Sequence, residues 1–155
     1  MGWGLVVLAG IAAQLGMGPT FVERVESPVY EASGSPSELA GRAVTCMGEK
    51  LKPGVITAPT IVAQDLAAGR VVANNAFEYG EGGWLGSTYR ARSRMIFEAR
   101  EGRFRIVHTE IEALIFSDWE PISEVNKRGA AAARAAMQAI SDEIAACVKQ
   151  PAAVW

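Results

Sequence analysis

The segment 90–111 predicts its own strand pairing, and this pairing constrains the rest of the fold. Two runs of alternating side chains, 90–100 and 103–111, flank the dipeptide Glu101-Gly102. A two-residue turn of this kind fixes the register, because partners are found by counting outward from it. On one face, the count pairs Ala99 with Phe104, Phe97 with Ile106 and Met95 with His108. On the other face it pairs Glu98 with Arg105, Ile96 with Val107 and Arg94 with Thr109.

The alternation changes phase after Val107. The apolar residues beyond it stand at odd positions, namely Ile111, Ala113 and Ile115. Because a change of phase moves side chains to the other face of a sheet, we expect a bulge or strong twist near residues 108–110.

Two helices are indicated by their caps and apolar stripes. Ser35, Pro36 and Glu38 form the pattern of a capping box with proline at the first helical position, which predicts a helix over 36–51. Its expected buried stripe is Leu39, Ala43, Cys46 and Met47. The alanine-rich segment 124–149 predicts a second helix, whose buried face is expected to carry Met137, Ile140, Ile144 and Val148.

Three further strands complete the expected sheet. Residues 20–26 alternate well enough for a first strand, and 60–65 with 70–77 read as a hairpin whose turn uses Gly69 at positive φ. The glycine-rich segment 81–86 is expected to be a flexible connection, and 118–123 is expected to break the sheet ahead of the second helix.

The predicted order is strand, helix, four antiparallel strands, helix, within one α+β domain over 19–155. Both helices should share one face of a twisted antiparallel sheet of about five strands, because each has a single apolar stripe. The chain resembles a bacterial family of uncharacterised exported proteins, which is a domain of unknown function with a TATA-box-binding-protein-like (TBP-like) fold. The resemblance lies in this order of elements, in the segment Arg103-Phe-Arg-Ile-Val and in the Ser-x-x-Glu helix start. The resemblance covers roughly residues 20 to 149 and implies this fold and export. The resemblance implies no catalytic residues.

Residues 1–18 are expected to be a signal peptide. No charged side chain occurs before Glu23, and the apolar run 5–13 is followed by small residues up to Gly18. The run is shorter than the roughly 20 apolar residues of a membrane span, so no span is expected in the mature protein. We therefore expect a periplasmic or secreted protein. The alternatives for this segment are a retained amphipathic or anchoring helix and an ordinary helix of a cytosolic domain.

Five arginines form the main candidate binding site. The 15 Lys and Arg residues and 17 Asp and Glu residues give a formal net charge of −2, which argues against a surface that binds polyanions everywhere but leaves room for a local patch. By the hairpin register, the face opposite Phe97 and Phe104 carries Arg90, Arg92, Arg94, Arg103 and Arg105. These side chains can bind carboxylate, phosphate or an anionic glycan. The alternative is a solvated strand face with Glu98 and Arg105 as a cross-strand pair.

Aromatic residues around the glycine-rich loop are a second candidate. Trp84 and Tyr89, with Tyr79, could form a recognition lip for a ligand. The alternative is that these rings anchor the loop to the core.

Cys46 and Cys147 lie on the two helices that are expected to cover the same sheet face. In an oxidising compartment such a pair is a candidate disulfide, whereas two separate core packing positions are the alternative.

The sequence contains no specific catalytic signature. Two cysteines and one histidine cannot fill a closed zinc site without carboxylates, so no metal or other cofactor is expected. His108 has Glu110, Glu112 and Asp118 near it in sequence and could act as a general base. By register, however, it points toward the helix-covered side beside Met95, where a hydrogen-bonded core residue is expected.

Together these features predict a non-enzymatic binding or structural module of the cell envelope, with an unknown envelope protein or an anionic ligand as its partner. One alternative is an intracellular nucleic-acid-binding module that uses the open sheet face; it is disfavoured because the predicted face has no clear stacking ring among its arginines. A second alternative is a periplasmic hydrolase centred on His108.

Overall fold

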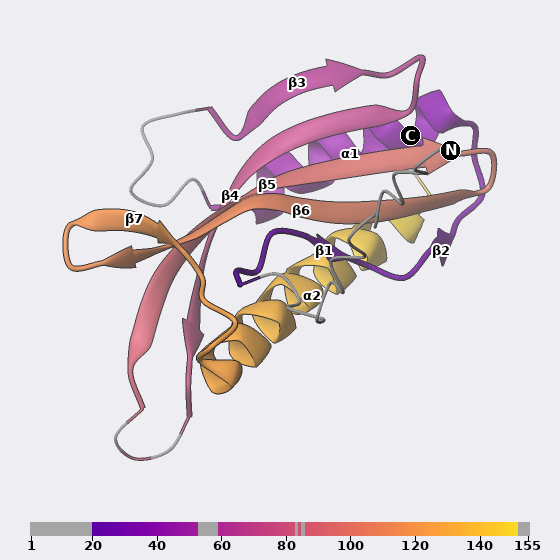
Figure 1. Cartoon of the computed structure of the whole chain (residues 1–155). Helices are drawn as coiled ribbons and strands as arrows, with labels where there is room; N and C mark the ends of the chain where they lie inside the picture. Colours follow the sequence, from indigo (N-terminus) through magenta and orange to yellow (C-terminus); the bar gives the residue numbers. More distant parts are fainter. Residues whose placement is uncertain (1–19, 53–58, 83, 85, 152–155) are drawn as a thin grey trace, which may run out of the picture.

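One long hairpin forms the centre of the β-sheet (Figure 1). The computed structural model describes residues 20–52, 59–82, 84 and 86–151. In it, β5 (Thr88–Arg100) pairs antiparallel with β6 (Arg103–Ile115). All six pairs counted outward from Glu101-Gly102 are present, from Ala99 with Phe104 to Arg94 with Thr109. The turn and the alternation therefore predicted the register correctly.

The expected change of phase is a bulge in β6. Arg94 pairs with Thr109 whereas Arg92 pairs with Glu112, so β6 contains one residue more than β5 over this stretch. Glu110 takes a φ of 50° there, in the left-handed region. The bulge returns the apolar side chains that follow to the buried face of the sheet.

The hairpin predicted between residues 60 and 77 is also present. β3 (Ile61–Asp65) pairs with β4 (Arg70–Gly80), and Gly69 in the turn has the expected positive φ of 70°. β4 in turn pairs with β5 along its whole length. The strand order is β1-β6-β5-β4-β3, and β2 and β7 also pair with β6.

The sheet has seven strands among the described residues, rather than about five. The single strand expected over 20–26 is reduced to β1 (Val25–Glu26), and β2 (Tyr30–Glu31) follows it. Both pair with β6. Pro28 lies between them and has no backbone N–H to donate, which accounts for the interruption of a continuous strand.

The break expected at residues 118–123 was wrong. β7 (Asp118–Pro121) turns back after Phe116, whose φ is 56°, and pairs with β6 through Leu114 and Trp119. Its proline is the last residue of the strand, a position at which a missing N–H costs little.

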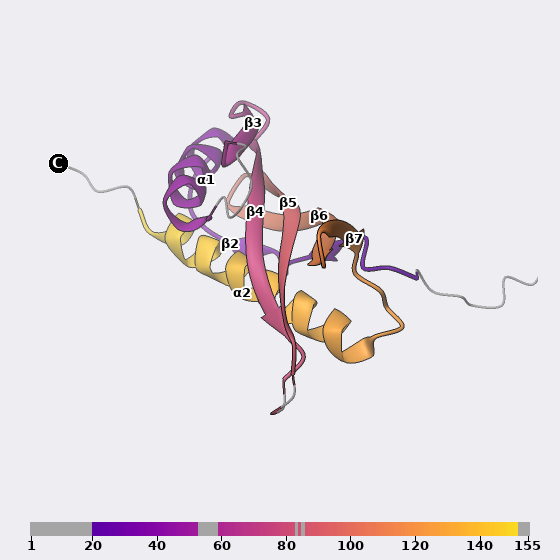
Figure 2. The same ribbon diagram turned by 90° about the vertical axis from the view of Figure 1, so that its left-hand side faces the viewer.

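Two helices cover one face of this sheet (Figure 2). α1 (Pro36–Lys50) begins with the predicted capping box at Ser35 and Glu38. α2 (Lys127–Lys149) begins three residues later than expected, because the Asn126 side chain accepts the Gly129 N–H at 3.1 Å and caps the helix there. The predicted stripes are buried except Ile140, which is half-buried; the buried residues are Leu39, Ala43, Cys46, Met47, Met137, Ile144 and Val148.

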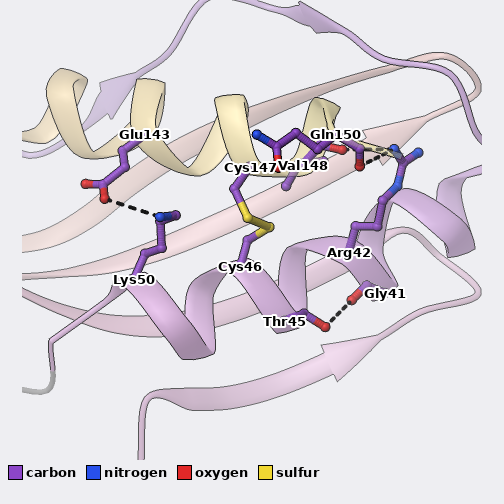
Figure 3. Close-up of a disulfide and its surroundings, with 9 residues drawn as sticks. All are labelled: Gly41, Arg42, Thr45, Cys46, Lys50, Glu143, Cys147, Val148 and Gln150. Carbon is purple, nitrogen blue, oxygen red and sulfur yellow. Dashed lines mark hydrogen bonds and ion pairs between the residues drawn. A yellow bond between two sulfur atoms is a disulfide. The ribbon is translucent and has the colours of Figure 1, made fainter. Parts of the chain in front are cut away.

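A disulfide joins the two helices at their C-terminal halves (Figure 3). Cys46 and Cys147 are bonded, with their Cα atoms 5.9 Å apart. Arg42 of α1 donates to the Val148 and Gln150 carbonyls at 2.9 and 3.4 Å, and so satisfies carbonyl groups at the end of α2. The helices are therefore connected covalently and by hydrogen bonds at one end of the domain.

A chain of polar side chains crosses the buried face between two apolar clusters. Asn75 Nδ2 donates to Ser93 Oγ at 3.3 Å, which leaves the Ser93 hydroxyl hydrogen for His108 Nδ1 at 3.0 Å. His108 Nε2 then carries the ring proton and lies 3.0 Å from Ser141 Oγ on α2. The neutral form of the histidine satisfies this chain. Burial lowers the pKa of His108 to about 4, although a backbone hydrogen bond with Met137 acts in the opposite direction.

Neither helix combines the length and the hydropathy that crossing a membrane requires, within the part of the chain that the structure describes. The expected signal peptide, residues 1–18, lies outside the described residues.

The disulfide predicts a large effect of reduction on stability. Closing a loop with a sequence separation of 101 residues should stabilise the fold by about 4.7 kcal/mol in the chain-entropy model. Thiol alkylation of the denatured, unreduced protein should label neither Cys46 nor Cys147, and reduction should lower the urea midpoint. Labelling of both cysteines before reduction would contradict the bridge.

The burial of His108 predicts acid destabilisation. Its pKa is about 4 in the folded protein and near 6.5 when unfolded, so the unfolded state binds the proton first as the pH falls. Stability should therefore be highest above about pH 6.5 and decrease by about 3 kcal/mol down to pH 4, below which this contribution is constant. In a His108→Gln variant this decrease in stability between about pH 6.5 and pH 4 should be missing. The effect of carboxylate protonation on stability is common to both proteins.

The pKa of His108 can be measured directly, because the chain contains a single histidine. Its imidazole proton resonances can be followed by NMR against pH without ambiguity. A titration midpoint close to 6.5 in the folded protein would refute the burial argument.

Candidate anion-binding face

The face of β4, β5 and β6 that points away from the helices is called here the open face. The structure places all five arginines selected from the sequence on it, opposite the buried Phe97 and Phe104. Three of them stand on β5 and two on β6. Their positions follow from the register of the central hairpin.

The β5 arginines are matched by glutamates from the flanking strands. Arg90 lies 4.0 Å from Glu78 on β4. Arg92 and Arg94 lie 2.6 and 3.4 Å from Glu112 and Glu110 on β6; Glu110 is inside the bulge and Glu112 is the first paired residue after it. Exposed ion pairs of this kind contribute about 1 kcal/mol at most. These three side chains therefore form a neutralised ladder rather than the expected cationic patch.

Two further contacts, or their absence, distinguish the guanidinium groups of Arg92 and Arg94. The Arg92 guanidinium lies 4.3 Å from the centre of the Trp119 ring on β7, in cation–π geometry. Arg94 Nε is buried and has no hydrogen-bond partner among the described residues.

Arg105 belongs to a separate group of charges. Its Nε donates to Glu98 at 2.8 Å, and this hydrogen bond raises the pKa of Arg105. Glu26 on β1 lies 3.8 Å from the same guanidinium. The pKa of Glu26 is lowered chiefly by a hydrogen bond from Arg24, with a smaller contribution from Arg105.

Cations exceed anions at one end of the open face. There the β3–β4 and β5–β6 turns lie together, at the right-hand end of the sheet in Figure 1. A hollow of about 450 Å³ between them is lined by Arg70, Arg100, Arg103, Arg105 and Glu98, together with Val29, Ala68, Ala99 and Phe104. We refer to these four arginines and Glu98 as the arginine cleft. It contains four cationic side chains and one anionic side chain.

Sequence reasoning missed two members of the cleft. Arg100 stands directly opposite Arg103, and the turn count that gave the other pairs could have found it. Predicting Arg70 as a member of the cleft would have required the register of β4 with β5, in which Arg70 lies opposite Glu98. That register is not fixed by a short turn, because a longer glycine-rich connection separates these two strands.

The aromatic residues around the 81–86 segment do not form one common surface. Tyr79 and Tyr89 stack at 5.4 Å and pack with the apolar cluster on the helix-covered face, as the anchoring alternative describes. Trp84 is 94% exposed. Tyr89 stands at the Gly80–Thr88 end of the β4–β5 pair and Trp84 lies in the connection beyond it, whereas the arginine cleft is at the Arg70–Glu98 end.

A larger hollow of about 740 Å³ lies between α2 and the edge of β4. Its charged lining residues have both signs, and Lys50 pairs with Glu143 at 3.8 Å (Figure 3). Three cationic and two anionic side chains line it, and an excess of one charge does not indicate a class of ligand.

His108 lies in the environment of a core residue. Its side chain is fully buried, and its two ring nitrogens face serine hydroxyls rather than a carboxylate. The neutral chain of hydrogen bonds offers no contact with a substrate from solvent. Among the described residues, no group of three or more His, Cys, Asp or Glu side chains is placed to hold a metal ion.

No protein-family model matches the chain, and no curated protein matches it. Among solved structures, a DUF4468 family protein from Bacteroides ovatus is 15% identical, with a TM-score of 0.62 over 83% of this chain and 86% of the other. A TBP-like protein from Parabacteroides distasonis is 11% identical, with a TM-score of 0.49 over 81% of each chain. The chain thus has an α+β fold similar to that of a bacterial protein from a family of unknown function, as the sequence resemblance implied.

Proposed function

We propose that the protein is an exported bacterial domain that binds an anionic component of the cell envelope through its open face. The observation that carries this proposal is the arginine cleft, where four arginines and one glutamate line a hollow on a sheet face that neither α1 nor α2 covers. A binding role, rather than catalysis, fits a face whose residues are ion pairs and guanidinium groups.

Export is supported by the bond between Cys46 and Cys147. Disulfides persist in the periplasm and outside the cell, whereas the cytosol keeps thiols reduced. The charge-free apolar run near the start of the sequence is consistent with the same route.

The proposal predicts a salt-sensitive association with envelope material. The protein, without its expected signal peptide, should be recovered from the periplasmic or secreted fraction of its source bacterium. The purified protein should sediment with isolated envelopes at low ionic strength and dissociate as salt is raised, because exposed charge attraction is screened over about 8 Å at physiological ionic strength.

Variants test the role of the open face. Replacing Arg70, Arg103 and Arg105 by Gln should weaken the association. A control with Lys127→Gln, Arg128→Gln and Lys149→Gln, all exposed residues of α2, makes the same change in net charge and should bind like the parent. Retention of the protein in the cytosol, or equal binding by both variants, would refute the proposal.

A further inference from the structure

Two arginines of the cleft face each other without a counter-charge. Arg100 and Arg103 are direct cross-strand partners beside the β5–β6 turn. Like charges in this position destabilise a hairpin. Among the described residues, no carboxylate oxygen lies within 4.0 Å of either guanidinium, although Glu31 on β2 is opposite Arg103 in the register. The pair therefore leaves two positive charges side by side with no carboxylate within ion-pair distance among the described residues.

The other two arginines increase this excess. Arg70 and Arg105 stand on either side of Glu98, across β4–β5 and β5–β6 respectively. The Glu98 carboxylate is hydrogen-bonded by Arg105. Glu98 neutralises one of the four guanidinium groups, so the cleft has a local charge of about +3 from its lining residues.

Both turns that carry these side chains are held in place by backbone contacts. The Ala99 N–H donates to the Gly69 carbonyl at 2.8 Å, and a Cβ on Gly69 would lie 2.7 Å from the Ala99 oxygen. On the other turn, the Gly102 N–H donates to the Gly34 carbonyl, and the Ala32 N–H donates to the Gly102 carbonyl, both at 3.1 Å. The backbone beneath the arginines is therefore preorganised, which reduces the entropy lost when a ligand binds.

Extending the proposed function, on which this inference rests, we propose that the arginine cleft binds a phosphate monoester group. Such a group has three terminal oxygens and a charge of about −1.5 to −2 at pH 7. It can accept from the three guanidinium groups that Glu98 leaves unmatched, whereas a carboxylate has two oxygens and one charge. The hollow of about 450 Å³ matches small-molecule sites, and Val29 and Ala68 line it for contact with the organic substituent.

The test measures binding by isothermal titration calorimetry at low ionic strength, near 30 mM salt. The probes are inorganic phosphate, glycerol 3-phosphate and acetate, together with phosphatidylcholine vesicles that contain phosphatidic acid, a lipid with a phosphate monoester headgroup. The test variant is Arg100→Gln/Arg103→Gln. Its control is Lys127→Gln/Arg128→Gln, which makes the same change in charge away from the cleft.

The parent and the control should bind glycerol 3-phosphate, and the test variant should bind it about tenfold more weakly or worse, since each lost charge-assisted hydrogen bond is worth about 1.5 to 3 kcal/mol. Acetate should bind more weakly than phosphate to the parent. Binding to free phosphates but not to vesicles identifies a soluble source, and the reverse identifies a lipid. If the double variant does not fold, Arg70→Gln takes its place in the same comparison.

The inference is overturned if the parent binds none of the phosphate probes, if acetate binds equally well, or if the test variant and the control have the same affinity. These results are distinguishable from failure of the proposed function. A protein that binds envelopes but no phosphate monoester retains the envelope role and loses this ligand. A protein that binds phosphate through Arg100 and Arg103 but is found in the cytosol retains the ligand site and loses the envelope role.

Discussion

β5 and β6 pair along nearly their whole lengths, and the other described elements pack on this hairpin or on a strand that it positions. β4 pairs with β5 and places β3, while three short strands pair with β6. The same hairpin supplies Met95, Phe97, Phe104 and Ile106 to the largest part of the core, against α1 and α2. Because strand side chains alternate between faces, burying these four residues also fixes which arginines reach the open face.

The parts of the fold that could be predicted are those whose signals are local. The β5–β6 register followed from a two-residue turn, and the start of α1 followed from a reciprocal cap, so both depend on residues a few positions apart. β7 was missed because Trp119 and Pro121 do not have a strand-like pattern alone, and their pairing depends on the bent end of β6. In the site, the arginines of β5 were identified, but Glu110 and Glu112 were not recognised as the partners of two of them, because the bulge at Glu110 decides which side chains of β5 and β6 meet.

Charge is distributed unevenly along a single face. The ladder of β5 arginines is matched by Glu78, Glu110 and Glu112, whereas the far end of the same strand has Arg100 opposite another arginine. Matched charges keep a sheet face soluble at little gain or cost in stability. Unmatched like charges are unfavourable by themselves, so their concentration at one end is more informative about ligand binding than the total number of arginines on the face.

The polar chain through His108 also determines how α2 can sit along the sheet. Sliding α2 by one helical turn, about 5.4 Å, would bring Met137 or Ala145 opposite the imidazole in place of Ser141. The buried ring would then lose a hydrogen-bond partner, at a cost of about 1 to 3 kcal/mol. Within the apolar stripe, the same slide would exchange Ile144 and Val148 but would put Ser141 or Ala133 at the place of the buried Met137. The histidine thus favours the same longitudinal alignment of the helix that the Cys46–Cys147 bond holds from the side of α1.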